Sequence, residues 1–165
     1  MSDNADYTDP DVEEAWLIAR RAEIDAHLRQ SGGRYGGISD WPFWCKAPVT
    51  SVWGIESLIS PGFLGWWAIV GDHPPECISS QNVKDPRAAL EAVCNRWIEA
   101  LNALHDGRPA EHGTSEDPRS IAKKLAAQIA AVRACVENDA LWLVPEGDGE
   151  DSAAEVCDND GDGDG

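Results

Sequence analysis

The sequence predicts an α+β single domain, in which a small, mainly antiparallel three-stranded sheet is covered by three amphipathic helices. Two observations lead to this class. Residues 41–80 hold five of the eight tryptophans and the only clear strand patterns in the chain. Three stretches outside them repeat apolar residues at helical spacings, and each opens with aspartate followed by proline. We therefore expect one core built between a sheet and helices.

The first helix is predicted over residues 10–30. Asp9 offers a side-chain acceptor at the N-cap, and Pro10 presets φ at the first helical position, where its missing N–H costs nothing. Gly32-Gly33 ends the helix. Its apolar side is predicted to consist of Val12, Trp16, Leu17, Ile24 and Leu28.

The first strand is predicted within Val49 to Leu58, a stretch rich in β-branched and aromatic residues. The two-residue period of a strand places Trp53 and Ile55 on one face. Val52 and Leu58 are expected on the other face, so both faces of this strand should be partly covered.

A second strand is predicted over residues 63–70, at the centre of the sheet. Ser60-Pro61-Gly62 precedes it and is a strong turn signal. The run itself has no charge and is far too short to span a membrane, which fits a strand buried on both faces. Residues 76–79 can add a short third strand, although Pro74-Pro75 limits its pairing.

Two further helices are predicted over residues 86–106 and 118–138, again after aspartate and proline. The polar segment 107–116 is a loop of ordinary length between them. The apolar stripes of the two helices consist of Leu90, Val93, Trp97, Leu101 and Leu104, and of Ile121, Leu125, Ile129, Val132 and Val136.

The formal charge of −17 is concentrated at the two ends of the chain. Residues 1–14 carry six acids and residues 146–165 carry nine, with no lysine or arginine in either segment. We expect residues 1–9 and 146–165 to be disordered acidic segments that flank a domain over 10–145. This charge argues against binding to a nucleic-acid backbone and is compatible with a basic protein partner.

The cysteine pattern and the apolar runs favour a soluble cytoplasmic protein. Five cysteines is an odd number, and their spacing contains no C-x-x-C pair, so neither a disulfide framework nor a zinc site is indicated. No signal peptide or membrane-spanning run is visible. No cofactor motif is found, so we expect no cofactor.

Three residues are weak catalytic candidates. Asp72 and His73 follow a predicted strand, close to Glu76 and Cys77, and an Asp–His base or a Cys–His nucleophile is chemically conceivable there. A structural turn is the simpler interpretation. Glu56 is the one acid inside the first strand, and it lies either on a solvated face or buried beside a partner.

Trp41, Trp44 and Trp53 are candidate binding residues, because an aromatic face combines a large contact area with a polar edge. Tryptophan is also a common core residue. Alternation places Trp66 and Trp67 on opposite faces of the sheet, so they cannot both serve one surface. Trp41 and Trp44 lie in a proline-containing segment and are the better candidates for exposure.

Asp158, Asp160 and Asp162 match the opening of a calcium loop, which needs carboxylates at alternate positions. The position of the bidentate glutamate is missing from this sequence. A solvated low-complexity segment is therefore the simpler interpretation.

The order W-P-x-W, V-W-G-I-E-S, P-G-x-x-G-W-W-x-I-x-G-D-x-P, I-S and D-P-R-A resembles a family of small uncharacterised bacterial proteins classed as a domain of unknown function. The resemblance covers roughly residues 12–142. It implies no activity, cofactor or catalytic residue, and His73 and Cys77 are outside its pattern. The residues that carry it are Trp41, Pro42, Trp44, Val52 to Ser57, Pro61, Gly62, Gly65 to Trp67, Ile69, Gly71, Asp72, Pro74, Ile78, Ser79 and Asp85 to Ala88.

Two functional hypotheses remain open. The first is a cytosolic bacterial binding or regulatory module, such as an inhibitor or immunity-type protein that binds a basic partner. The alternative is a small hydrolase that uses Glu56, Asp72 or His73 in a cleft lined by tryptophan.

Overall fold

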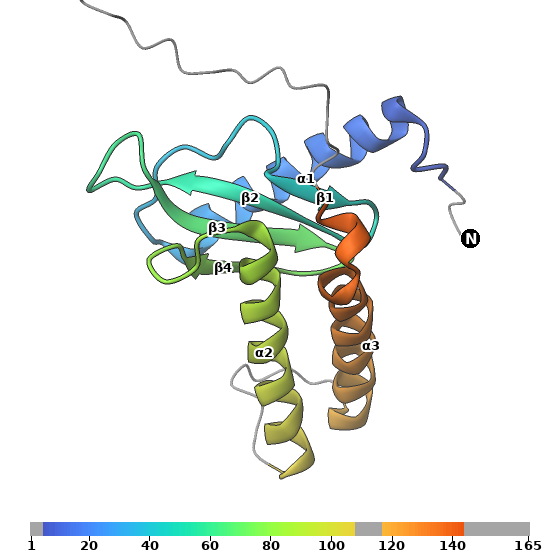
Figure 1. The fold of residues 1–165 in the computed structure, drawn as a ribbon. Coiled ribbons are helices and arrows are strands. Elements are labelled where there is room, and N and C mark those ends of the chain that lie inside the picture. Colours follow the sequence, from blue (N-terminus) through green and yellow to red (C-terminus); the bar gives the residue numbers. More distant parts are fainter. Residues whose placement is uncertain (1–4, 108–116, 144–165) are drawn as a thin grey trace, which may run out of the picture.

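The computed structural model describes residues 5–107 and 117–143 (Figure 1). Three long helices, four strands and one short 3₁₀ helix make up this part of the chain. In order they are α1 (Pro10–Ser31), β1 (Trp44–Lys46), β2 (Thr50–Glu56), β3 (Leu64–Gly71), β4 (His73–Ser79), α2 (Pro86–His105), α3 (Pro118–Glu137) and η1 (Asp139–Leu141). The predicted α+β class is confirmed.

The sheet is an antiparallel meander in the order β1-β2-β3-β4. The predicted number of three strands is wrong, because β1 adds a fourth through the pairs Trp44↔Val52 and Lys46↔Thr50. This strand has only three residues and lies between prolines, so it is too short to show an alternating pattern. The predicted central strand is confirmed as β3, which pairs with a strand on each side.

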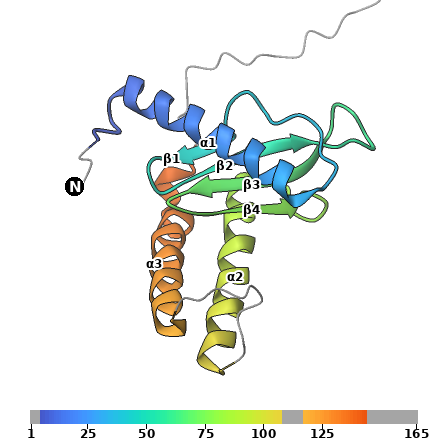
Figure 2. The same cartoon turned by 180° about the vertical axis from the view of Figure 1, so that it is seen from behind.

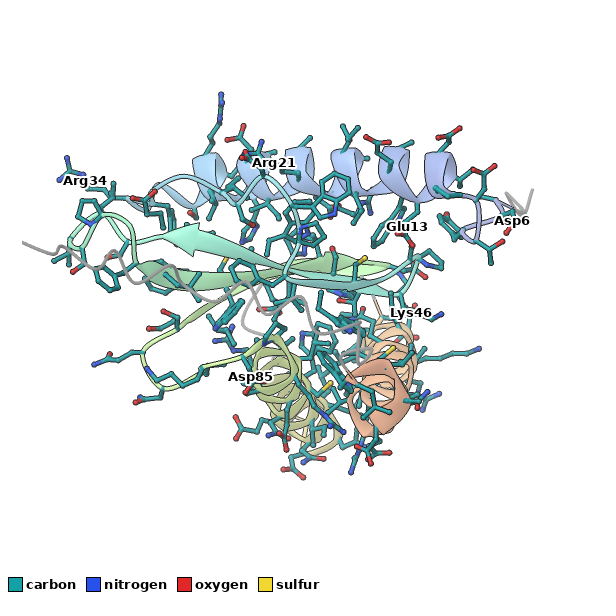
Figure 3. The ribbon with its side chains drawn as sticks, turned by 45° about the horizontal axis from the view of Figure 1, so that its top comes forward. Asp6, Glu13, Arg21, Arg34, Lys46 and Asp85 are labelled. Carbon is teal, nitrogen blue, oxygen red and sulfur yellow. The ribbon has the colours of Figure 1, made fainter. Side chains whose placement is uncertain are left out.

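Helices cover both faces of the sheet, α1 on one face and the α2–α3 pair on the other (Figures 2 and 3). Trp53 and Ile55 both pack with α1, as the two-residue alternation of a strand predicts. Val52 and Trp67 pack with α2 and α3, and Trp66 lies on the α1 side. The predicted division of these side chains between the two faces is therefore confirmed.

Each long helix begins as predicted, at an aspartate that caps free backbone N–H groups. The side chain of Asp9 accepts from the N–H of Asp11, that of Asp85 from Ala88, and that of Asp117 from Arg119. Gly32 ends α1 with a φ of 67°, in the left-handed region that favours glycine.

A tryptophan pair closes the sheet edge against the end of α3. The rings of Trp44 and Trp142 stack at 4.3 Å, and Trp44 Nε1 donates to Leu141 O. Arg87 of α2 donates to Val136 O and pairs with Asp139, which links the two helices at this point. Trp142 is thus docked on the core, whereas Leu143 is exposed.

The α2–α3 pair leaves one end of the sheet uncovered. The β2–β3 turn, residues 57–63, projects beyond the α2–α3 pair (Figures 1 and 3). Leu58, expected to share the face of Val52, lies in this turn outside β2 and is exposed. Among the described helices, none combines the length and apolar character that a membrane crossing requires.

Candidate functional site

The three catalytic candidates lie at two separate ends of the sheet. His73 hydrogen-bonds to Thr50 at the first residue of β2, whereas Glu56 is the last residue of the same strand. At about 3.3 Å per residue, roughly 20 Å separates the two ends. Glu56 therefore cannot act on one substrate together with Asp72 and His73, and each end has to be considered by itself.

Both ring nitrogens of His73 are held by the protein. Nδ1 lies 2.9 Å from Pro74 O, and Nε2 lies 2.9 Å from Thr50 Oγ1. A carbonyl oxygen only accepts, so Nδ1 carries the proton and Nε2 accepts from the Thr50 hydroxyl. The ring also contacts Trp97 edge to face at 5.0 Å. These contacts tie the start of β4 to β2 and α2.

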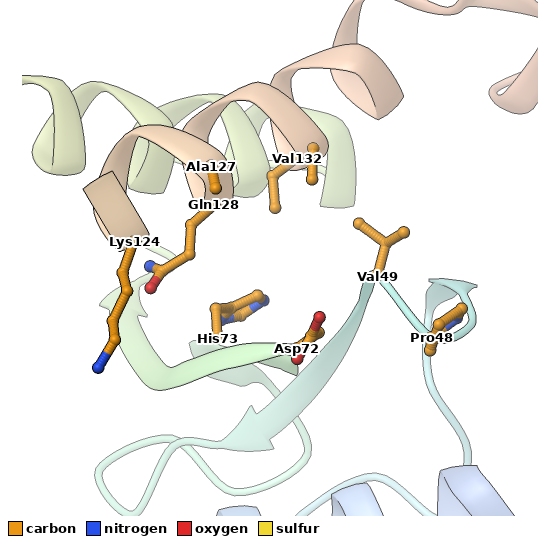
Figure 4. A pocket seen from close by; sticks show the side chains of 9 residues that line it. Pro48, Val49, Asp72, His73, Lys124, Ala127, Gln128 and Val132 are labelled. Atoms are coloured by element: carbon orange, nitrogen blue, oxygen red, sulfur yellow. The ribbon is translucent and has the colours of Figure 1, made fainter. Parts of the chain in front are cut away.

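The cavity beside His73 has a volume of about 380 Å³ and lies between the sheet end and α3 (Figure 4). Thr50 resembles a nucleophile next to a base, but its side chain is completely buried and does not line the cavity. The geometry thus favours a structural role for the Thr50–His73 pair. The lining residues are Pro48, Val49, Asp72, His73, Lys124, Ala127, Gln128, Ala131 and Val132.

Burial lowers the pKa of His73 below its ordinary value of 6.5. The hydrogen bond to Pro74 O and the carboxylates of Glu76, Glu23 and Asp72 offset part of this effect. Desolvation acts in this direction because it disfavours the charged imidazolium.

We expect the His73 ring to make the folded protein less stable as the pH is lowered. Below pH 6.5 the unfolded chain binds a proton at His73 that the folded chain resists, so the free energy of unfolding decreases until the folded pKa is reached. His73→Gln, which keeps an acceptor for Thr50, should reduce the slope by up to about 1.4 kcal/mol per pH unit. Urea titrations between pH 7.5 and 5 measure the free energy of unfolding of both proteins. The same pH dependence for the wild type and His73→Gln would contradict a lowered pKa of His73.

The neighbouring Glu76 and Cys77 do not complete a catalytic group. Glu76 accepts from Trp97 Nε1 at 2.9 Å and pairs with Arg96 at 3.0 Å, on the α2 side of the sheet. Cys77 packs on the α1 side, and burial raises its pKa to about 11. A Cys–His pair between Cys77 and His73 is therefore not formed.

The three candidate tryptophans differ in accessibility. Trp53 is 1% exposed, and its Nε1 donates to Ser51 Oγ within the core. Trp44 is held by Trp142. Trp41 is 55% exposed, so it is the one of the three that a partner can contact broadly. Asp158, Asp160 and Asp162 lie outside the described residues.

A second cavity, of about 290 Å³, lies at the end of the sheet that α2 and α3 leave uncovered. Two loops form it, the segment before β1 and the β2–β3 turn. We call it, together with Trp41, Leu58 and Ile59, the open-end surface. The cavity is lined by Gly37, Ile38, Ser39, Asp40, Phe43, Gly54, Glu56, Gly62, Phe63 and Leu64.

Gly54 shapes the floor of this cavity. A Cβ at this position would lie 2.6 Å from Phe43 Cε2 and 2.8 Å from Leu64 Cδ1, so only glycine lets these two side chains close over the strand. The ring of Phe43 then meets Trp67 edge to face at 5.2 Å. The wall of the cavity is thus anchored on the core.

Glu56 occupies a fixed position at the edge of the cavity. Its Oε1 accepts from the N–H of Gly62 at 2.8 Å. Its backbone N–H donates to Gly37 O, and its carbonyl accepts from Gly36 N–H. One carboxylate is therefore placed between both loops at the open end.

Sequence reasoning missed Phe43 and Phe63 as surface residues, although they are 56% and 71% exposed. Phe63 was expected to begin the buried strand, and β3 instead begins one residue later, at Leu64. The available signal was the Ser60-Pro61-Gly62 turn, which places the residue after it close to solvent.

Comparison with known proteins gives a match to a protein family. Residues 11–142 match the model of a family described as Domain of unknown function (DUF4826). No curated protein and no solved structure matches the chain.

Proposed function

The chain belongs to the family described as Domain of unknown function (DUF4826), and from the geometry of its surface we propose that it is a non-catalytic binding module for a basic partner protein. One observation carries the proposal. Seven large apolar residues of the described chain are exposed, and five of them, Trp41, Phe43, Leu58, Ile59 and Phe63, belong to the open-end surface.

Such clustering favours recognition over chance exposure. Single exposed apolar side chains are common, but contiguous ones on a monomer often mark an interaction site. Tryptophan and phenylalanine are enriched in protein interfaces, where they contribute a large rigid contact area. Phe63, Phe43 and Trp41 are the exposed aromatic residues of this surface, at 71%, 56% and 55% exposure.

The charge of the chain favours a basic partner. The net charge is −17, and the charged residues that line the open-end cavity are the acids Asp40 and Glu56. Arg34 belongs to the same end but projects on the α1 side (Figure 3). A field of this sign attracts cationic proteins and raises their association rate.

The sheet edges favour side-chain contacts over strand addition. On the β2 side, β1 and residues 36–39 already occupy the edge of β2 through backbone hydrogen bonds. On the other side, β4 carries Pro74 and Pro75, which lack the N–H groups that a paired strand needs. A partner is thus expected to dock on exposed side chains.

The test is affinity capture with the full-length protein, followed by measurement of Kd for the captured partner. Trp41→Ser combined with Phe63→Ser should weaken binding at least tenfold, since hot-spot aromatics each contribute more than about 1 kcal/mol. Ile18→Ser is the matched control, because Ile18 is 61% exposed on α1 and does not line the open-end cavity. His73→Gln should also leave Kd unchanged.

Equal Kd values for the wild type and the double variant would overturn the proposal. Binding that is lost in His73→Gln, together with hydrolysis of a test ester or peptide by the wild type alone, would favour the hydrolase alternative.

A second expectation concerns residues 146–165, which carry nine acids. Their removal changes the formal charge from −17 to −8. If long-range attraction guides the encounter, the truncated protein should associate more slowly with the partner, with little change in dissociation rate. The difference should shrink as salt rises towards 0.5 M. Stopped-flow or surface-binding kinetics measure both rates, and a change confined to dissociation would contradict this role of the acidic segment.

A further inference from the structure

We propose that the open-end cavity receives an arginine side chain of the partner, with Glu56 as its anion. This inference rests on the proposed binding function and adds the chemistry of the central contact. Asp40 and Glu56 are the charged residues that line the cavity. Asp40 already faces Arg21, whose Nη2 lies 3.9 Å from its Oδ1. Glu56 is therefore the better anchor for an incoming cation.

The Glu56 carboxylate is oriented before any ligand arrives. The N–H of Gly62 binds Oε1 at 2.8 Å, and Oε2 lies next to Gly37. The backbone of Glu56 pairs with Gly36 and Gly37, which fixes the position of its Cα. A group held in this way loses little conformational entropy on binding, which favours a specific contact over a diffuse attraction.

The walls of the cavity fit a planar cation. Phe43 and Phe63 supply aromatic rings, while Leu64 supplies apolar contact for an aliphatic stem. A guanidinium stacks on aromatic rings, is less strongly hydrated than an ammonium, and presents a fork of donors to a carboxylate. Arginine therefore matches this combination better than lysine.

The size of the cavity also fits one side chain. Its volume of about 290 Å³ is at the lower limit of small-molecule sites, which hold roughly 300–1,000 Å³. Trp41, Leu58 and Ile59 are exposed in the same two loops and do not line the cavity. This arrangement suits a protein segment that inserts one residue and packs its neighbours on exposed side chains of these loops.

The experiment is an NMR titration of the full-length protein with Nα-acetyl-arginine amide. The backbone amides of Gly37, Gly54 and Gly62 report on the site, since all three line it. Nα-acetyl-citrulline amide has the same shape without the charge, and Nα-acetyl-lysine amide has the charge without the planar group. We expect the arginine compound to bind at least fivefold more tightly than either.

Glu56→Gln should reduce binding of the arginine compound at least fivefold, while its amide oxygen can still accept from Gly62. Asp72→Asn is the matched control, because it removes the same charge from the other cavity and should leave binding unchanged. Thermal unfolding of both variants verifies that they are folded.

Several outcomes would overturn the inference. These are equal affinity for citrulline or lysine, no shifts at the three glycines, or unchanged arginine binding by Glu56→Gln.

The proposed function can fail independently of the arginine contact. If Trp41→Ser with Phe63→Ser abolishes partner binding and Glu56→Gln does not, the binding surface is correct and the arginine contact is wrong. If arginine binding depends on Glu56 but the double variant binds the partner as tightly as the wild type does, the arginine site is correct and the proposed docking surface is wrong.

Discussion

Trp67→Ala is expected to lower the free energy of unfolding by about 3–5 kcal/mol, because it removes a large side chain from a close-packed core. Trp67 is 1% exposed, lies on the inner strand β3, and packs with Val52, Ile69 and residues of α2 and α3. Its Nε1 also donates to Val83 O at 2.9 Å, so the loop before α2 loses a hydrogen bond as well.

A denaturant titration measures this effect, and Trp41→Ala is the natural comparison. Trp41 is more than half exposed, so its removal should cost less than about 0.5 kcal/mol. A loss below about 1 kcal/mol for Trp67→Ala would contradict the central position of β3. Because Phe43 rests on Trp67, the variant should also disturb the wall of the open-end cavity.

Gly71→Ala is the second substitution with a large expected effect. A Cβ at Gly71 would lie 2.2 Å from Val49 O and 2.6 Å from Thr50 Cα. Both are backbone atoms, at the start of β2 and in the residue before it, so the clash cannot be relieved by moving a flexible side chain. Overpacking of this kind costs about 1–3 kcal/mol, and backbone displacement can raise it further.

Thermal unfolding is a suitable measurement for Gly71→Ala, with an expected decrease in Tm of roughly 2–4 °C per kcal/mol for a chain of this size. Gly37→Ala is the control, since the nearest atom to its added Cβ lies 4.0 Å away. Equal Tm values for the wild type and Gly71→Ala would show that Gly71 does not approach the backbone of Val49 and Thr50 this closely.

Most of the secondary structure could be predicted because local signals agree with the tertiary structure. Asp85 and Asp117 cap helices where aspartate-proline pairs predict them, and these caps involve neighbouring residues only. The faces of β2 followed from its two-residue period. The edge strand β1 could not be predicted, since its three residues are placed by pairing with β2 and not by their own pattern.

The binding candidates show what local patterns cannot supply. Trp53 and Trp41 are the same residue type within one short stretch, yet one is 1% and the other 55% exposed. The difference depends on α1, which covers Trp53 from a segment more than twenty residues away in the chain. Whether an aromatic residue is available to a partner is thus decided by which element lies opposite it.

The positions of the catalytic candidates likewise depend on contacts between segments that are distant in the sequence. Glu56 and His73 each stood out by residue type, but the meander places them at opposite ends of β2. Glu56 acquires its position from Gly62 across the turn and from Gly36 and Gly37 in the preceding segment. None of these contacts follows from a motif spacing.

Hydrogen–deuterium exchange of the full-length protein with its captured partner locates the binding surface, because it maps protected residues without any substitution. We predict slower exchange on binding in residues 36–43 and 57–64, the two loops of the open-end surface. Slower exchange confined to residues 47–50, 72–74 and 124–132, around the His73 cavity, would contradict binding at the open end and move the binding site to the other end of the sheet.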